Sequence, residues 1–289
     1  MKHTVVDAQV HIWAANSAER PWVVEGRTHR DTPLGADELL AEMDVAGVDA
    51  AILVPPTFEG YRNDLVLAAA ARHPSRFGVM GRIALDDPVA GEPMVRGWRE
   101  QPGALGFRLV LSAGSDVNHP QGGSWLLDGS ADWFWPVAQE CGVPVMLHCI
   151  DLLDEVAGIA DRHPRLKIVI DHLGLPTSAR DAEVGRRVED LVPLADRPNI
   201  AVKAGSIPCY TTESYPYPAM RGYLRRVVDL FGASRVCWAS DISRLPCDYA
   251  TLVRFFATEP FLDDDERELV LGRGLCEWLD WNPALPKEN

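Results

Sequence analysis

The strongest constraint on the fold of this chain is a pattern that recurs along its length. Short β-rich runs alternate with segments long enough to form helices. Several of the runs are almost continuously apolar, as expected of parallel strands that are buried on both faces. The runs occupy residues 4–13, 50–56, 76–84, 104–111, 143–150, 166–174, 199–206 and 235–242.

The segments between the runs have the apolar spacing and the end signals of amphipathic helices. The clearest examples are residues 36–48, 63–74, 152–164 and 222–232. Eight strands that alternate with helices predict a (β/α)8 TIM barrel, an α/β fold in which residues 1–289 form a single domain. A doubly wound open sheet is the alternative, but no G-x-G-x-x-G turn follows the first strand. A final acidic helix over residues 263–279 is expected to pack on the outside of the barrel.

The net charge and the cysteine content limit which partners and which cellular location are expected for the protein. The formal charge is −14 at pH 7, which argues against nucleic acid or an anionic membrane as the main partner. The sequence predicts no leader peptide and no membrane helix, which would need an apolar run of ~20 residues. The six cysteines form no C-x-x-C pair, which favours reduced thiols and a cytoplasmic protein. The expected partner is a small-molecule substrate, and a homodimer is the default assembly.

Polar side chains stand near the C-terminal ends of several predicted strands. They are Gln9, His11, Arg108, His148, Asp171, His172, Lys203, Ser240 and Asp241. A single histidine in a strand is more often structural than catalytic, but polar groups inside apolar runs are costly unless they meet partners. Because strand ends converge at one face of a barrel, a shared active site explains the whole set best.

Strand periodicity orients some of these residues. Gln9 and His11 are two apart, so they face the same side of the first strand. Asp171 directly precedes His172 and is expected to point the other way, toward the helices, as a brace. Lys203 is expected to be a pocket charge or a salt-bridge partner.

Two long connections follow predicted strands and are candidates for the walls of a pocket. Residues 14–35 follow Trp13 and carry further tryptophan and arginine residues, whereas residues 207–220 are rich in tyrosine and proline. Their composition favours a substrate pocket over ordinary surface loops, with Trp13 as a substrate contact.

Five motifs, taken together and in order, resemble the amidohydrolase superfamily, and more narrowly its amidohydrolase-related (amidohydrolase 2) branch of lactonases and decarboxylases. The motifs are DAQVHIW (7–13), GFRLVL (106–111), VMLHC (145–149), VIDHLG (169–174) and WASDI (238–242). The resemblance spans nearly the whole chain.

The resemblance also implies a ligand set. In metal-dependent members, two first-strand histidines, a fifth-strand histidine and an eighth-strand aspartate hold a divalent ion, and the matching positions here are Gln9, His11, His148 and Asp241. It implies a catalytic or substrate-contacting role for His172. Gln9 departs from the pattern, which leaves a possible weak zinc or manganese site at His11, His148 and Asp241.

The number of metals and the chemistry follow from these positions. Some members bridge two metals with a strand-four lysine, but this chain offers Arg108 there, so a binuclear site is not expected. With one metal, the ion would activate a water and polarise a carbonyl, while Asp241 or His172 moves the proton.

The resembled branch also includes lactonases that work without metal. In that chemistry Asp241 would act as general base on a water. His148 and His172 would donate hydrogen bonds to the developing oxyanion. The amide of Gln9, or His11, would assist them. The substitution at Gln9 favours this metal-free chemistry, so no cofactor is favoured.

Three functions are therefore weighed. The leading prediction is a hydrolase that opens a lactone of a small carboxylated or sugar-derived substrate, whose carboxylate Arg108 would bind through a bidentate pair. The alternatives are a metal-dependent decarboxylase of an aromatic or unsaturated acid, and a non-catalytic ligand-binding barrel. The predicted catalytic residues are Asp241, His172 and His148, and the predicted substrate-binding residues are Gln9, His11, Arg108, Trp13 and Lys203.

Overall fold

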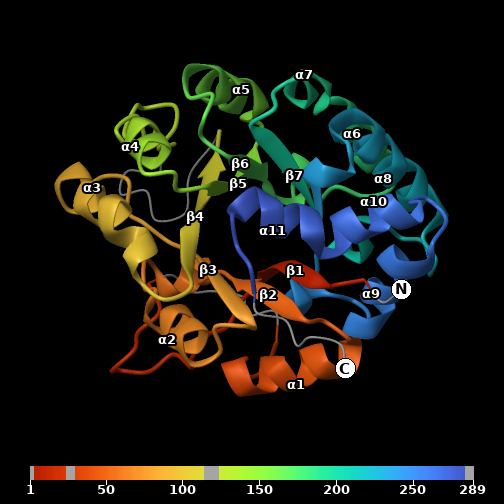
Figure 1. Cartoon of the computed structure of the whole chain (residues 1–289), viewed down its shortest axis with the longest axis horizontal. Helices are drawn as coiled ribbons and strands as arrows, with labels where there is room; N and C mark the ends of the chain where they lie inside the picture. The colour runs from red at the N-terminus through yellow and green to blue at the C-terminus, as the bar shows by residue number, and fades with distance from the viewer. Residues whose placement is uncertain (1–2, 24–29, 114–123, 284–289) are drawn as a thin grey trace.

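The eight predicted strands all form and make one parallel sheet. A computed structural model of the chain describes residues 3–23, 30–113 and 124–283. Its strands follow one another in chain order around a TIM barrel (Figure 1), as the alternation of the sequence predicts. They are β1 (Val6–Val10), β2 (Ala50–Leu53), β3 (Phe77–Gly81), β4 (Ala104–Ser112), β5 (Val145–Ile150), β6 (Ile168–Ile170), β7 (Ile200–Gly205) and β8 (Val236–Ala239).

Helices surround the sheet and connect its strands (Figure 1). The α-helices are α1 (Ala36–Ala46), α2 (Asp64–Arg72), α3 (Pro88–Gly97), α4 (Phe134–Glu140), α5 (Leu153–Arg162), α6 (Ala182–Glu189), α7 (Val192–Ala195), α8 (Pro218–Phe231), α9 (Tyr249–Thr258), α10 (Asp264–Glu268) and α11 (Gly274–Leu279). Short helical turns are η1 (Thr57–Glu59), η2 (Trp98–Glu100), η3 (Asp171–Gly174), η4 (Ile207–Tyr210), η5 (Ala233–Arg235), η6 (Ile242–Arg244) and η7 (Leu269–Arg273). In the described part of the chain, no helix combines the length and the apolar character needed to cross a membrane.

The barrel closes where β1 meets β8. The backbone N–H of Asp241 donates to the carbonyl oxygen of Gln9 at 3.0 Å. The buried carboxylate of Asp7 adds to this junction, since its Oδ1 accepts the N–H groups of Ser240 and of Gln9, each at 2.9 Å. Tyr249 on α9 donates its hydroxyl to Oδ2 of Asp7 at 2.5 Å. The junction therefore ties Gln9 on β1 to Asp241, which closely follows β8.

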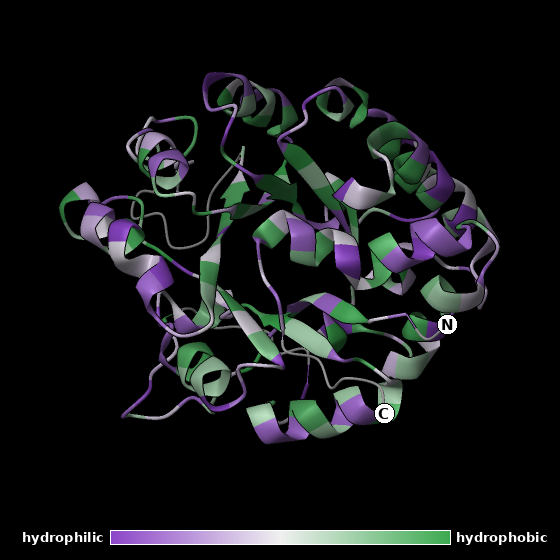
Figure 2. Cartoon of the chain, in the orientation of Figure 1, coloured by the Kyte–Doolittle hydropathy of each residue, from purple (hydrophilic) through white to green (hydrophobic). Residues whose placement is uncertain are grey.

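Apolar side chains fill the lower part of the barrel, and every strand contributes to this lumen cluster. Its members are Val6, Ala8, Ala50, Ile52, Val54, Met80, Leu105, Met146, Val169, Ala201, Cys237, Ala239, Leu275 and Leu279. A second and larger apolar cluster lies between the strands and the helices, and Figure 2 shows the corresponding contrast between apolar strands and helices with polar faces. Because the lumen is packed below, a cavity can open only toward the C-terminal ends of the strands.

The C-terminal helices depart from the sequence prediction of one helix on the outside of the barrel. The segment is divided into α10, η7 and α11. Leu275 and Leu279 of α11 belong to the lumen cluster, with residues from the N-terminal ends of the strands, and α11 lies across the barrel in Figure 1. At Gly272 a Cβ atom would lie 2.8 Å from the carbonyl oxygen of Thr4. The absence of a side chain there lets the helix approach β1 and close the bottom of the barrel.

Candidate active site

A cavity of ≈ 470 Å³ opens at the C-terminal ends of the strands. Seven of the eight residues that the sequence predicts for the site line it: Gln9, His11, Trp13, Arg108, His148, His172 and Asp241. Further lining residues are Pro56, Thr57, Phe58, Val110, Thr177, Ser243 and Arg244. The structure therefore brings together side chains from β1, β4 and β5 and from the segments that follow β1, β6 and β8.

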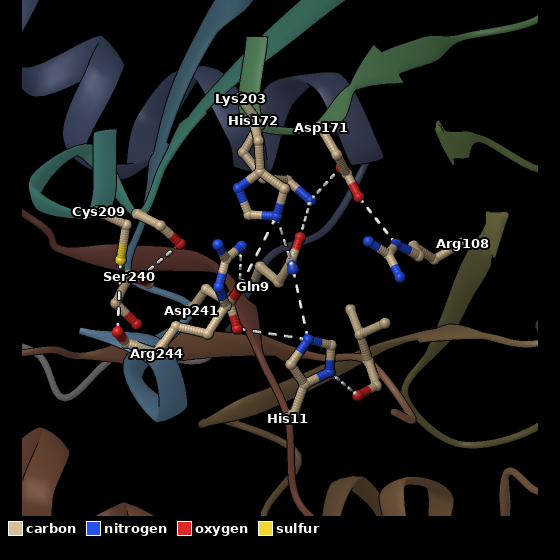
Figure 3. A network of polar contacts seen from close by, with 12 residues as sticks. Gln9, His11, Arg108, Asp171, His172, Lys203, Cys209, Ser240, Asp241 and Arg244 are labelled. Carbon is tan, nitrogen blue, oxygen red and sulfur yellow. Dashed lines mark hydrogen bonds and ion pairs between the residues drawn. The ribbon is translucent and has the colours of Figure 1, made fainter. Parts of the chain in front are cut away.

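The amide of Gln9 has a defined orientation at the floor of this cavity (Figure 3). Lys203 donates from Nζ to Oε1 of Gln9 at 3.0 Å. An ammonium can only donate, so the NH2 group of Gln9 must face the other way. There it lies 3.4 Å from Nε2 of His11 and 3.2 Å from Nε2 of His172. The Nδ1 of His11 lies 2.8 Å from the carbonyl oxygen of Val54, so Nδ1 carries the proton and Nε2 is an acceptor.

Lys203 is fully buried and does not line the cavity, which corrects its predicted role as a substrate contact. Its Nζ lies 2.6 Å from Oδ1 of Asp171 and 3.1 Å from the sulfur of Met146. These two contacts and Gln9 use all three N–H groups of the ammonium. Burial lowers the pKa of Lys203, while Asp171 opposes that shift. Lys203 is therefore a salt-bridge partner that orients Gln9 from behind.

Asp171 and His172 both face the barrel interior, contrary to the prediction that Asp171 points toward the helices. Val169 belongs to the lumen cluster, so strand alternation also turns Asp171 inward. His172 would then point outward, but its backbone is left-handed, with φ 50° and ψ 34°, which turns its ring back into the site. Gly205 on β7 leaves space for that ring, since a Cβ atom there would lie 2.6 Å from Nδ1 of His172.

Asp171 bridges two buried cations. Its Oδ2 accepts a hydrogen bond from Nε of Arg108 at 2.9 Å, while its Oδ1 binds Lys203. Burial opposes ionisation of Asp171, but the charges of Lys203 and Arg108 outweigh it and hold the pKa of this carboxyl below its ordinary value. The chain of contacts in Figure 3 thus runs from Arg108 through Asp171 and Lys203 to Gln9.

Asp241 stands at the centre of the polar groups in the cavity. Its backbone is left-handed, with φ 47° and ψ 51°, a strained conformation that is common at functional sites. Its carboxylate lies 3.4 Å from Nε2 of His11 and 3.8 Å from Nε2 of His172. Arg244, three residues further on, lies 3.5 Å from the same carboxylate. Arg244 is not among the site residues predicted from the sequence, although it follows closely on the last predicted strand, where barrel sites are built.

The two strand-end histidines are neutral at physiological pH. Burial and the charge of Arg108 lower the pKa of His148 to about 3. Burial lowers the pKa of His172 to about 4, although Asp241 opposes the shift. The rings of His148 and His172 meet edge to face, with centroids 5.8 Å apart. A neutral imidazole has one donor nitrogen and one acceptor nitrogen. Each nitrogen therefore either donates or accepts a hydrogen bond and cannot do both.

The residues present do not fit a tightly held metal ion. Among residues 3–23, 30–113 and 124–283, no group of three or more His, Cys, Asp or Glu side chains is arranged to hold one. At the first-strand ligand position, the amide oxygen of Gln9 is bound to Lys203, and its NH2 group faces the histidines. A metal needs lone pairs, and this position presents N–H groups backed by a buried ammonium. The donor set suits acid–base chemistry better.

The two long connections have different roles. Trp13, which directly precedes the first connection, lines the cavity. Trp22 within that connection packs on the cavity residue Phe58, with ring centroids 4.5 Å apart. Residues 24–29 of this connection lie outside the described residues. The second, predicted over residues 207–220, lines a neighbouring cavity of ≈ 480 Å³ instead, through Pro208, Cys209 and Thr211. Arg244 lines both cavities, so they adjoin.

Comparison with known proteins supports the family suggested by the motifs. The chain is 27% identical to an L-fucono-1,5-lactonase from Burkholderia ambifaria, over 94% of each chain. It shares the fold of a probable 2-pyrone-4,6-dicarboxylic acid hydrolase from Acinetobacter baumannii with citric acid bound, with a TM-score of 0.74, 17% identity and coverage of 96% and 100% of the two chains.

A third protein has the same fold. It is an amidohydrolase from Burkholderia multivorans with bound zinc, which matches with a TM-score of 0.76, 21% identity and coverage of 98% of this chain and 100% of that one. A family model described as Amidohydrolase matches residues 6–273, almost the whole chain. The chain therefore belongs to the amidohydrolase 2 family.

Proposed function

We propose that this protein is a hydrolase that opens the ring of a small lactone, with Asp241 as the general base. The observation that carries the proposal is the position of the Asp241 carboxylate, which lines the cavity 3.4 Å from Nε2 of His11. A carboxylate accepts hydrogen bonds, so a water bound to Asp241 donates one proton to it and keeps a lone pair free for attack. The lactonase relative supports the same reaction class.

The first step is the attack of this water on the lactone carbonyl. Asp241 takes one proton from the water, and the oxygen of the water bonds to the carbonyl carbon to give a tetrahedral oxyanion. Collapse of that oxyanion breaks the ring C–O bond. Asp241 then returns its proton to the leaving alkoxide, so the products are a hydroxyl and a carboxylic acid, and the carboxylate of Asp241 is regenerated.

The oxyanion needs hydrogen-bond donors, and the contacts divide the histidines into two groups. His11 and His172 present Nε2 as an acceptor to the amide of Gln9. His148 lines the cavity and is neutral at physiological pH because its pKa is about 3. We therefore propose that the N–H of His148 donates a hydrogen bond to the oxyanion. His172 is then a partner of Asp241 and of the water.

Arg108, Arg244 and Trp13 supply the substrate contacts. Among the described residues, Asp171 binds Arg108 through Nε and not through its terminal nitrogens, which form the fork that suits a carboxylate. Arg244 lies beside Asp241 and can orient ring hydroxyls. Trp13 offers an aromatic wall to a lactone ring.

The other two functions have less support. A decarboxylase of the metal-dependent kind needs a ligand where Gln9 presents N–H groups to the histidines. A binding protein without catalysis leaves unexplained why a carboxylate in a left-handed backbone conformation faces two proton-free imidazole nitrogens.

A panel of lactones, with and without carboxylates, tests the proposal when acid release is followed in a pH-stat in the presence of EDTA. We expect hydrolysis of at least one lactone, and a loss of about 10²–10⁴-fold in kcat for Asp241→Asn, since that is the contribution of a general base. Glu277→Gln, a surface change of the same kind, is the control. Full activity of Asp241→Asn on the best substrate would refute the assignment of the base.

A further inference from the structure

Glu59 is a buried carboxylate that the mechanism above does not use. It ends η1, the turn that follows β2, and only 2% of it is exposed. Its Oε1 accepts the backbone N–H of Ala14 at 3.1 Å. Arg20 binds both of its oxygens, from Nε to Oε1 at 2.9 Å and from Nη2 to Oε2 at 2.8 Å. These contacts meet the cost of a buried charge and hold the connection after β1 against η1.

The connection is fixed on both sides of Glu59. Arg20 also reaches Asp64 at the start of α2, with Nη1 2.7 Å from Oδ2. Trp22 donates from Nε1 to the carbonyl oxygen of Ala14 at 3.2 Å, and its ring packs on that of Phe58. The peptide groups of Ala14 therefore link Glu59 to Trp22, which in turn supports Phe58 from behind.

Three aromatic side chains form an aromatic corner at this point, namely Trp13, Trp22 and Phe58. The ring of Phe58 meets that of Trp13 edge to face, with centroids 6.1 Å apart and planes at 89°. Trp13 and Phe58 line the cavity, and so do Pro56 and Val110 beside them. Apolar walls of this kind gain affinity by covering hydrocarbon on a ligand.

The cavity has an apolar side and a polar side. The apolar residues named above follow β1 and β2 or lie on β4. The lining residues that follow β6 and β8 are polar: His172, Thr177, Asp241, Ser243 and Arg244. Because the strands run in chain order around the barrel, β2 and β4 lie across it from β6 and β8. A ligand that suits both sides is amphipathic, with its reacting group toward Asp241 and its hydrocarbon toward the aromatic corner.

We propose that the aromatic corner is a subsite for a hydrocarbon substituent of the lactone, and that Glu59 is the positioning residue that holds this corner in place. The proposal rests on the proposed lactonase function for the ring that is bound. It narrows the substrate to lactones that carry an alkyl group. Loss of Glu59 would release Ala14 and Arg20, so Trp22 would no longer support Phe58, while Asp241 and its neighbours would keep their contacts.

Lactams test the subsite without lactone turnover. The probe is 2-piperidone, which has an amide in place of the ester, and calorimetry compares it with derivatives that carry an ethyl group at each ring carbon in turn. At one position or more, the ethyl group should tighten binding by about 15-fold, which is about fourfold for each buried carbon. Glu59→Ala should reduce this gain to less than about threefold.

Two further variants control the measurement. Glu189→Ala is the matched control, because Glu189 accepts from Nε and Nη2 of Arg226 at 2.9 Å each, the same paired geometry, but is exposed on α6. It should leave the ethyl gain unchanged. Glu59→Gln keeps an oxygen for the N–H of Ala14 and loses the charge that binds Arg20. It should retain a gain of about fivefold, and it serves if Glu59→Ala does not fold.

Kinetics and a double variant distinguish positioning from a merely structural role. On lactones, Glu59→Ala should raise KM for alkyl-substituted rings by about 5–20-fold, with kcat within threefold and little change for unsubstituted rings. Phe58→Ala should lose the same ethyl gain, and the double variant should lose no more, since both residues act on one subsite. A structural carboxylate would lower the melting temperature without changing the preference for the ethyl group.

The outcomes separate the two proposals. A wild type that gains nothing from an ethyl group at any position, or an equal gain in Glu59→Ala and the wild type, overturns the inference and leaves the lactonase proposal intact. A gain that depends on Glu59 in a protein that hydrolyses no lactone supports the subsite and removes the proposed function.

Discussion

The Nζ of Lys203 lies 3.0 Å from Oε1 of Gln9. This contact determines which groups at the floor of the cavity donate hydrogen bonds and which accept them. Because the ammonium has no lone pair, the amide can present only its N–H groups to His11 and His172. Both imidazoles then turn Nε2, without a proton, toward Asp241. A lysine that never contacts the cavity thus decides which groups there accept protons.

Lys203→Met should therefore impair catalysis without loss of substrate binding. The amide of Gln9 would be free to turn, and its oxygen could face the histidines and favour the wrong tautomers. We expect kcat to fall by about 10–100-fold with KM within threefold, in line with the effect of misplaced acid–base partners. The free energy of unfolding should fall by about 3–5 kcal/mol, because Asp171 would keep only Arg108 as a partner.

Steady-state kinetics and urea unfolding measure both effects. Lys167→Met is the control, because Lys167 is exposed and donates to the carbonyl oxygen of Trp278. A variant at Lys203 with unchanged kcat would show that the orientation of Gln9 does not matter for the reaction.

Metal affinity should respond to Gln9 and Lys203 together. Gln9→His alone restores an imidazole but keeps a buried ammonium behind it, and this charge opposes a second cation. The double variant Gln9→His with Lys203→Met removes that charge. We expect about one zinc per chain in the double variant after dialysis against zinc, and far less in the single variant and in the wild type. Elemental analysis gives the answer, and equal zinc in both variants would contradict the role of Lys203.

Gly205→Ala probes the space that holds His172. A Cβ atom at this position would lie 2.6 Å from Nδ1 of His172, so the ring must move. We expect a loss of about 1–3 kcal/mol in unfolding free energy from overpacking, together with a fall in kcat of about tenfold or more.

Gly222→Ala on α8 is the matched control for this substitution, because nothing lies within 4 Å of its Cβ position. It should be neutral or slightly stabilising, since alanine favours a helix over glycine. Equal behaviour of the two alanine variants would show that His172 tolerates displacement.

Asp7 should make stability depend on pH at the junction of β1 and β8. Burial raises the pKa of Asp7 from 3.8 to about 6, although its hydrogen bonds oppose the shift. The folded state therefore holds the proton of Asp7 more tightly than the unfolded state does. This contribution to stability is complete below pH ~4 and is lost as the pH rises through about 6, for a total of ~3 kcal/mol.

The measurement compares the wild type with Asp7→Asn in urea titrations at several pH values between 4 and 8. Asparagine keeps an oxygen for the N–H groups of Gln9 and Ser240 but does not ionise. The unfolding free energy of the variant should therefore increase relative to that of the wild type as the pH rises. A constant difference across this range would show that Asp7 does not titrate as proposed.

Much of the fold and part of the site follow from local patterns. All eight strands could be predicted, because β-rich runs separated by helix signals are local properties of a sequence. Gln9, His11, His148 and Asp241 could also be placed near one another, since strand ends must converge in a barrel. The left-handed turn at His172, by contrast, breaks the alternation on which the prediction for Asp171 relied.

The sequence by itself determined the barrel and which strand ends are polar, because periodicity and residue type act over a few neighbouring positions. The tertiary structure alone decided that Lys203 binds Gln9 across 194 positions of the chain. It also decided that α11 closes the bottom of the barrel. These contacts depend on register, backbone turns and the competition of several cations for a few carboxylates, which are settled only when distant strands lie side by side.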